Sequence, residues 1–333
     1  MRYYWGLDIC RAIAVLLVFS VHYLSLFYPD TSATAWQGPV LRLGHSGVDL
    51  FFVLSGYLLY GAFLKKPEQP RLTFLQNRAW RIFPAYWVAL SAYVLAMFMV
   101  SSGPTGSENS WALDALKNVL LLPIIFDESP WMVVSWTLTF EWGWYLLLPL
   151  LFSAQFHKLS KNKRTLSLAA STLFFGLYFG AYGGPEQISL FFAGALLSEH
   201  QQAIGRCSIR ARALWCPLLL SLAIVLHTEA LWCSILLSGA GWALCLSLAL
   251  STTEAPGRPW FPAIFLGKIS YSFYLWHSLA LHATLRLFGE HAPWWLTVTA
   301  GLALSISLAT ISYKLVETPA LHLGKRYTQK CFK

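Results

Sequence analysis

Two basic residues lie in the first apolar stretch, Gly6 to Tyr28, where a membrane helix normally carries none. Arg11 and His22 are eleven residues apart, which on an α-helix is about 20° more than three full turns, so both side chains leave the same stripe. Their offset along the axis is roughly 16 Å, about half of a bilayer core. Ionisable groups at such depths usually mark a pathway or a site. The alternative is that Arg11 is an interfacial anchor and His22 a hydrogen-bonded packing residue.

A carboxylate in the second apolar stretch is expected at the depth of His22. The stretch begins near Gly44, which places Asp49 about five residues, or roughly 8 Å, below the outer surface. A carboxylate beside an imidazole fixes its tautomer and raises its basicity, as in general-base pairs. We therefore predict that Asp49 orients His22, with His45 as a substitute partner. The alternative is that Asp49 caps the start of its helix.

Two arginines end the first long polar segment. Arg78 and Arg81 are three residues apart, so on a helix they point in neighbouring directions and can grip one anion together. Most arginines at the inner end of a span serve as positive-inside anchors instead. Because Arg11 is expected at the same membrane face, three guanidinium groups could bind a phosphate-rich cytosolic ligand there. The roughly 16 Å from that face to His22 is about the length of the pantetheine arm of coenzyme A.

Further polar groups fall in two later apolar stretches. Glu141 is expected near mid-membrane with Tyr145 one turn away, and an unpaired ionised carboxylate there is very unfavourable. Glu141 is therefore protonated, paired, or lining a wet cavity. His277 is a second mid-membrane histidine, flanked by Tyr274, although buried tyrosines taken singly are ordinary core residues. Together with His22 and Asp49 these groups predict one polar chamber.

Two further pairs are interpreted mainly as structural. Ser55 and Gly56 allow close approach of another backbone, which is a packing signal, although the same small residues could leave room for a narrow ligand. Lys314 and Glu317, at the inner end of the last apolar stretch, are expected to form an ion pair at the interface.

The composition is that of a membrane protein. Of the 333 residues, 56% are hydrophobic and 12% are charged, whereas about a quarter of the residues of soluble proteins are charged. The apolar residues form long runs, which predict about ten transmembrane helices in an all-α fold. The ten expected spans are 7–28, 44–64, 82–101, 132–152, 166–183, 187–199, 213–228, 231–250, 268–288 and 294–316.

The distribution of basic residues predicts the orientation. With the N-terminus in the cytoplasm, 21 of the 24 lysines and arginines fall in cytoplasmic segments or at their helix ends, as the positive-inside rule requires. Both termini are then cytoplasmic, and the net charge of +9 reflects topology, so no nucleic-acid partner is expected. We predict a membrane domain at residues 1–320 and a short basic cytoplasmic tail at 321–333.

Three other features bear on function. The six cysteines show no CxxC and no metal-like spacing, so neither disulfides nor a metal site are expected. The long outer segment 102–131 is interpreted as a linker, with a lid or an acceptor-binding surface as the alternative. Ala33-Thr34-Ala35 after the first apolar run resembles a signal-peptide cleavage site, but Asp8, His22 and the later spans argue that this segment is retained.

Six motifs in order resemble the bacterial membrane acyltransferase family 3, whose members O-acylate polysaccharides, peptidoglycan and some small glycosides. They cover nearly the whole chain: Arg11-x10-His22, Gly47-Val48-Asp49 through Ser55-Gly56, Arg78-x2-Arg81 with Phe83-Pro84, Trp136-Thr137-Leu138-Thr139-Phe140-Glu141, Ser270-Tyr271-Ser272-Phe273-Tyr274-Leu275-Trp276-His277, and Val316-Glu317-Thr318-Pro319. The family often has two adjacent acidic residues in the fourth motif, whereas Trp142 follows Glu141 here. Without an extracytoplasmic hydrolase-like domain, the chain resembles the single-module type.

The resemblance implies cytosolic acyl-CoA, usually acetyl-CoA, as donor and a carbohydrate hydroxyl as acceptor, in the inner (plasma) membrane of a bacterium. It implies that Arg11 and His22 are essential and that Arg78 and Arg81 serve the donor. We expect His22 to take the proton of the attacking hydroxyl or to carry the acyl group briefly. The expected catalytic residues are His22, Asp49 and Glu141; the expected donor-binding residues are Arg11, Arg78, Arg81, Ser55 and Gly56; possible chamber-lining residues are Tyr145, Tyr274 and His277.

Two other classes of protein remain compatible with intramembrane polar residues. A transporter or flippase for a glycan or lipid-linked sugar also needs a polar chamber; it would be favoured by an inverted repeat, and none is evident. A structural or sensor protein would use the same groups only to fix helix packing. The sequence does not identify the acceptor, the acyl length or the oligomeric state.

Overall fold

Long apolar runs fold as helices because lipid offers no partners to backbone N–H and C=O groups, so each span must satisfy its own. The computed structural model describes residues 3–29, 37–100, 111–226, 231–251, 257–289 and 291–331, and within these ranges it contains helices and no strands. The expected all-α membrane fold is confirmed. The suggested cleavage site at Ala33–Ala35 lies outside the described residues.

Seven helices are long and apolar enough to cross a membrane within the described ranges: Trp5–Phe27, Val40–Lys65, Arg71–Val100, Lys161–Tyr182, Ile209–Leu226, Leu231–Ala249 and Trp294–Thr328. The other three expected spans are also helical, at Trp136–Ser153, Ile188–Arg206 and Ser270–Phe288. Their polar residues lower their hydropathy. A total of about ten crossings, with both termini in the cytoplasm, stays a prediction.

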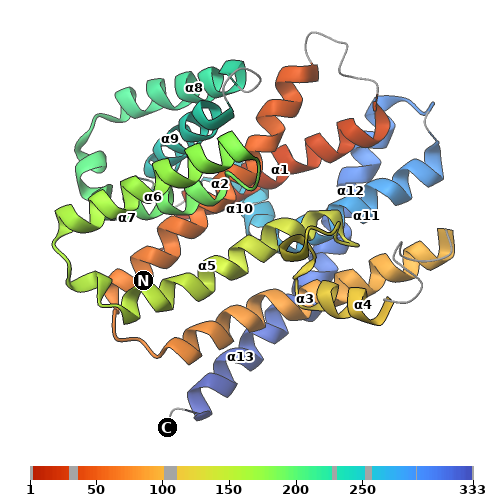
Figure 1. Ribbon diagram of the computed structural model, residues 1–333. Coiled ribbons are helices and arrows are strands. Elements are labelled where there is room, and N and C mark those ends of the chain that lie inside the picture. Colours follow the sequence, from red (N-terminus) through yellow and green to blue (C-terminus); the bar gives the residue numbers. More distant parts are fainter. Residues whose placement is uncertain are drawn as a thin grey trace. The chain divides into compact units, whose positions relative to one another are not determined.

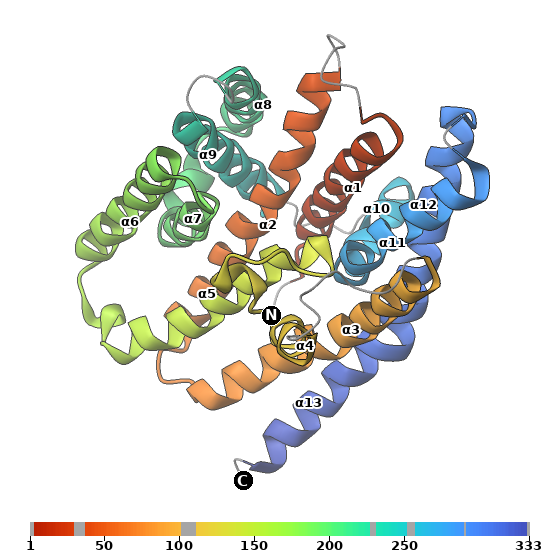
Figure 2. The ribbon, with the colours of Figure 1, turned by 45° about the vertical axis from the view of Figure 1, so that its right-hand side comes forward.

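The chain divides into two units, residues 1–68 with 147–270 and residues 69–146 with 271–333. The first unit contains α1 (Trp5–Phe27), α2 (Gln37–Lys65), α6 (Lys161–Tyr182), α7 (Ile188–Arg206), α8 (Ile209–Leu226), α9 (Leu231–Ala249) and α10 (Phe261–Lys268). Short 3₁₀ turns at Phe156–Lys158 and Arg258–Trp260 precede α6 and α10. Within this unit α2 packs against α1, α7 and α9, α8 packs against α9, and α10 packs against α1 (Figures 1 and 2).

Glycines let two of these helices touch. A Cβ at Gly56 of α2 would stand 2.1 Å from the Phe191 carbonyl oxygen of α7, and one at Gly194 of α7 would stand 2.1 Å from the Val53 carbonyl oxygen of α2. Neither position has space for a side chain. The backbones of α2 and α7 are therefore in direct contact, in the manner of small-residue crossings between membrane helices.

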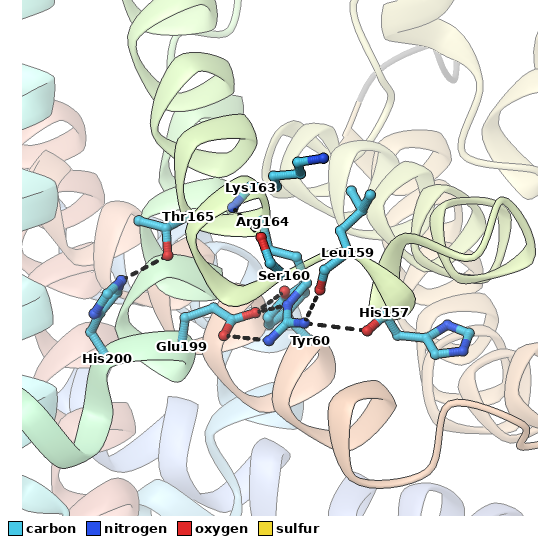
Figure 3. Close-up of polar contacts among 9 residues, drawn as sticks. All are labelled: Tyr60, His157, Leu159, Ser160, Lys163, Arg164, Thr165, Glu199 and His200. Atoms are coloured by element: carbon cyan, nitrogen blue, oxygen red, sulfur yellow. Dashed lines mark hydrogen bonds and ion pairs between the residues drawn. The ribbon is translucent and has the colours of Figure 1, made fainter.

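A buried ion pair also ties this crossing to α6. The Arg164 guanidinium of α6 donates to both carboxylate oxygens of Glu199 on α7, at 2.5 and 3.0 Å, and Tyr60 of α2 donates to the same carboxylate at 2.5 Å (Figure 3). Arg164 also donates to the carbonyls of His157 and Leu159. Three helices thus share one buried carboxylate, whose side chain is 3% exposed.

The second unit contains α3 (Arg71–Val100), α4 (Trp111–Val119), most of α5 (Trp136–Ser153), α11 (Ser270–Phe288), α12 (Trp294–Ser312) and α13 (Thr318–Cys331). A five-residue π turn, Tyr313–Glu317, joins α12 to α13 without interrupting the helical path. The domain boundary expected at 320/321 falls inside α13, which packs along α3. Both α3 and the last helix are thus longer than the apolar runs that predicted them.

The outer segment expected at 102–131 is folded where the structure describes it, from residue 111 onward, and its role as a linker, a lid or an acceptor-binding surface stays a prediction. It holds α4 and two 3₁₀ turns, Pro123–Phe126 and Val133–Ser135. Tyr86 of α3 donates to the Asn118 carbonyl at 2.6 Å, and the Trp131 N–H donates to the Asn118 side chain at 2.9 Å. Because Asn118 accepts a hydrogen bond from α3 and another from Trp131, the segment is anchored to α3.

Candidate active site residues in two units

Arg11 is fixed by a residue on its own helix. Its Nη1 donates to Asp8 Oδ1 at 2.7 Å, and the Tyr3 phenol donates to Asp8 Oδ2 at 2.5 Å. Partial burial and the Asp8 carboxylate raise the pKa of Tyr3 to about 12, so the phenol keeps its proton. α10 closes over this point, since a Cβ at Gly267 would stand 1.9 Å from the Asp8 carbonyl oxygen. The spacing of three residues between Asp8 and Arg11 could have indicated this ion pair from the sequence.

His22 is half-buried on α1, and its Nδ1 lies 2.9 Å from the Val18 carbonyl oxygen. A carbonyl accepts but cannot donate, so this contact is a hydrogen bond only when Nδ1 carries the proton. In that tautomer Nε2 holds the lone pair and is the nitrogen that can act as a base. The Val18 carbonyl thus fixes the tautomer of the ring, a role that the sequence analysis assigned to Asp49.

Asp49 has a different partner from the one expected. Its carboxylate is buried on α2 and accepts from Ser238 of α9 at 2.6 Å. The predicted hydrogen bond between Asp49 and His22 is therefore replaced by one to a serine that the sequence analysis did not single out. The two residues are 189 positions apart, so no local pattern could have paired them.

Gly56, next to Ser55 in the sequence, lies on the face of α2 that meets α7. The space where a Gly56 Cβ would stand is filled by the Phe191 backbone. The packing interpretation therefore holds for Gly56, and no ligand fits on that side of it.

In the second unit, Arg78 of α3 is enclosed by aromatic rings. Its Cζ lies 5.4 Å from the Phe74 ring centroid and 5.8 Å from that of Tyr145, which are cation–π distances. Its Nε is buried without a hydrogen-bond partner among the described residues. The rings hold the guanidinium in place while leaving that donor unused.

Arg81, one turn further along α3, makes no hydrogen bond or ion pair to any described residue. The carboxyl groups close enough to act on it electrostatically are Glu317 and Glu141. The two arginines expected to bind an anion are thus half-buried, adjacent and sparingly hydrogen-bonded, which suits the capture of phosphate oxygens.

Glu141 is paired. The Tyr145 hydroxyl donates to Glu141 Oε1 across one turn of α5, and both arginines lie within electrostatic range of the carboxylate. The carboxyl group therefore has a hydrogen-bond partner on its own helix.

Tyr274 and His277 of α11 are buried among backbone groups. The Tyr274 hydroxyl donates to the Val134 carbonyl at 2.9 Å and lies 2.8 Å from the Thr137 hydroxyl. His277 is fully buried, with Nδ1 2.8 Å from the Tyr274 carbonyl oxygen. The Tyr274 contacts hold the start of α5 against α11 and so position Glu141, whereas the His277 contact lies within α11.

The expected ion pair between Lys314 and Glu317 is wrong. The π turn that contains both residues directs them apart: Lys314 is exposed, whereas Glu317 is buried and accepts from Ser272 of α11 at 2.7 Å. A π turn contains one residue more than an α turn needs, which rotates the following side chains. The sequence offered no signal for this insertion.

The expected site residues fall into both units. The first holds Arg11, His22, Asp49, Ser55 and Gly56; the second holds Arg78, Arg81, Glu141, Tyr145, Tyr274 and His277. Among the described residues no group of three or more histidines, cysteines or carboxylates is arranged to hold a metal ion. The five cysteines whose side chains are described, Cys10, Cys207, Cys216, Cys233 and Cys245, are free thiols.

Comparison with protein families identifies the family of the chain. A family model described as an acyltransferase domain matches residues 4–314, nearly the whole chain. The chain belongs to acyltransferase family 3. This family member is an acyltransferase and a multi-pass membrane protein, as the ordered motifs predicted, and its substrate includes an acyl donor.

Three relatives of this acyltransferase illustrate the family. Nodulation protein 10 of Rhizobium leguminosarum bv. viciae is 26% identical over 312 residues, covering 83% of this chain and 82% of the relative. Exopolysaccharide production protein ExoZ of Rhizobium meliloti (strain 1021) is 26% identical over 315 residues, covering 86% of this chain and 93% of the relative. A protein of Staphylococcus aureus (strain COL) named as a predicted O-acetyltransferase is 23% identical over 370 residues; the match covers 96% of this chain but 57% of that longer relative. No solved structure matches significantly.

Proposed function

We propose that this acyltransferase moves an acyl group, namely acetyl, from acyl-CoA to a hydroxyl of a carbohydrate in the bacterial cell envelope. Two names among the relatives support the acceptor and the group transferred: one refers to exopolysaccharide production and another to O-acetyl transfer. The proposed location is the inner membrane, with the donor taken from the cytosol and both termini on that side.

The assignment of acyl-CoA as the acyl donor rests on the pair of arginines on α3. Arg81 makes no hydrogen bond to a described residue, and Arg78 is held by two rings with its Nε unused. Guanidinium groups in this state offer forked N–H donors to phosphate oxygens, which coenzyme A supplies. Arg11, fixed by Asp8, is proposed to help bind the same acyl-CoA. Gly56 is left to helix packing.

His22 is the proposed base. With Nδ1–H held on the Val18 carbonyl, Nε2 takes the proton of the acceptor hydroxyl as its oxygen attacks the thioester carbonyl. The carbon–sulfur bond then breaks, coenzyme A leaves as a thiolate, and the proton passes from His22 to the sulfur. Asp49 is proposed to contribute a buried carboxyl group on α2, held by Ser238, and Glu141 to bind the acceptor.

The test uses purified protein in proteoliposomes with acetyl-CoA labelled on the acetyl group and an envelope-glycan extract as acceptor. We expect His22→Ala to lower label transfer at least 100-fold, in line with the loss of a general base, at unchanged expression. His282→Ala is the matched control, because His282 makes the same contact, Nδ1 to the Ser278 carbonyl at 2.8 Å, outside the proposed site. Full activity of His22→Ala would refute the assignment. Label retained covalently on the wild-type protein would show instead that an acyl-histidine forms.

A further inference from the structure

The π turn at Tyr313–Glu317 brings a carboxylate into the interior of the second unit. π turns within α-helices occur often at functional sites, because the extra residue redirects side chains that an α-helix would place elsewhere. Here the consequence is a buried Glu317, 4% exposed, next to an exposed Lys314. A helix that served only to cross the membrane would have no need of a buried carboxylate at this point.

Two contacts hold the segment of α3 that carries Arg78 and Arg81 against α11 and α13. Tyr271 of α11 donates to the Ile82 carbonyl at 2.7 Å. A Cβ at Gly324 of α13 would stand 2.6 Å from the Trp80 ring, so the helix backbone lies directly on that side chain. The residues contacted flank Arg81 on both sides. The π turn, which joins α12 to α13, is consequently held at a fixed position relative to Arg81.

Glu317 and Arg81 act on each other without touching. Each lies within electrostatic range of the other, yet no ion pair joins them within 4.0 Å among the described residues. The carboxylate is instead held by the Ser272 hydroxyl at 2.7 Å. A carboxylate in direct contact would occupy the guanidinium donors, whereas one held back by a serine attracts the guanidinium and leaves those donors to an incoming anion.

We propose that Glu317, presented by the π turn and anchored by Ser272, is a positioning residue that holds the Arg81 guanidinium ready for the phosphate groups of the acyl donor. The inference rests on the proposed donor role of Arg81. Glu317 acts on donor binding through Arg81 and takes no part in the transfer step.

The test compares steady-state kinetics with acetyl-CoA for four variants in proteoliposomes. We expect Glu317→Gln to raise KM for acetyl-CoA roughly tenfold, within the range found for coupled neighbouring residues, with kcat little changed. Arg81→Ala should raise KM further. The double variant Arg81→Ala/Glu317→Gln should match Arg81→Ala alone, because Glu317 has no effect once its target is removed. Lys314→Gln should behave as wild type.

Ser272 provides a second, milder probe. Ser272→Ala should reproduce part of the KM increase of Glu317→Gln, and Ser272→Thr, which restores a hydroxyl, should reverse it. Thermal unfolding in detergent identifies any variant whose fold is damaged. For the serine variants, equilibrium binding of acetyl-CoA then takes the place of the KM measurement.

The outcomes separate the inference from the proposed function. If Arg81→Ala leaves both KM and acetyl-CoA binding unchanged, the donor role of Arg81 fails and the inference fails with it. If Arg81→Ala raises KM but Glu317→Gln does not, or if the two effects multiply in the double variant, the donor role survives and the positioning role of Glu317 is overturned.

Discussion

Single residues in this acyltransferase are held by partners that define what each can do. Arg11 is fixed by Asp8, His22 by a backbone carbonyl and Asp49 by Ser238. In each case the partner sets the direction of a charged or basic group inside a protein interior, where an unpaired group would be costly. The chemistry proposed for His22 and the anion binding proposed for Arg11 therefore both depend on neighbours that do not react.

The Asp8–Arg11 pair gives a prediction at this scale. Asp8→Asn keeps the shape of the side chain but removes its charge, so the Arg11 guanidinium loses its fixed direction. We expect acyl transfer to fall about tenfold or more, the equivalent of 1.4 kcal/mol or more, with Arg11→Ala at least as damaging. Tyr3→Phe is the control, because it removes the phenol's hydrogen bond and keeps the ion pair. Transfer by Asp8→Asn at the wild-type rate would show that Arg11 needs no partner.

Whole helices are positioned by close backbone contacts and by a few shared polar groups. α2 and α7 touch at Gly56 and Gly194, and the Arg164–Glu199 pair joins α6 to them. α2 carries Asp49, so the packing of this crossing decides where that carboxylate lies. In the second unit, the contacts that α3 makes with α11 and α13 position these helices.

Gly194 gives the prediction for this element. In Gly194→Ala the new methyl group meets the backbone of α2, which cannot move aside as a side chain can, so we expect a loss of about 1–3 kcal/mol in the free energy of unfolding. Gly205→Ala is the matched control on the same helix, because nothing lies within 4 Å of its Cβ. Its stability should be unchanged or slightly higher, since alanine favours helix more than glycine. Thermal unfolding in detergent measures both, and equal melting temperatures would contradict the packing argument.

At the scale of the whole molecule, lipid is expected to cover the apolar side chains that a further layer of protein would cover in a soluble protein. Many large apolar side chains remain exposed on the helices, among them Met99, Leu150, Leu166 and Leu315. In water such a surface would aggregate, whereas in a bilayer it is the expected outer surface of a membrane protein. The orientation within that bilayer rests on the distribution of lysines and arginines.

Cysteine labelling tests that orientation. Cys207 at the end of α7 is an exposed free thiol, whereas Cys10 and Cys216 are buried and Cys233 and Cys245 half-buried. In a Cys331→Ser background, we expect a membrane-impermeant maleimide to label Cys207 only after the cells are permeabilised. Leu116→Cys, exposed on α4, should be labelled in intact cells. The reverse pattern would place the termini outside.

The sequence alone determined the membrane class, the helical stretches, the family motifs and the residues expected to do chemistry. These follow from hydropathy, charge distribution and local spacing, all of which are properties of neighbouring residues. The Asp8–Arg11 pair, three residues apart, belongs to the same category and could have been read from the sequence.

Only the tertiary structure decided which groups face one another. It paired Asp49 with Ser238 instead of His22, anchored the segment at 111–135 to α3, and turned Glu317 toward Ser272 and away from Lys314. Such contacts join residues far apart in the chain or depend on a single extra residue in a helical turn. Hydrophobic periodicity cannot specify them, because it records which face of a helix is apolar and not which partner that face meets.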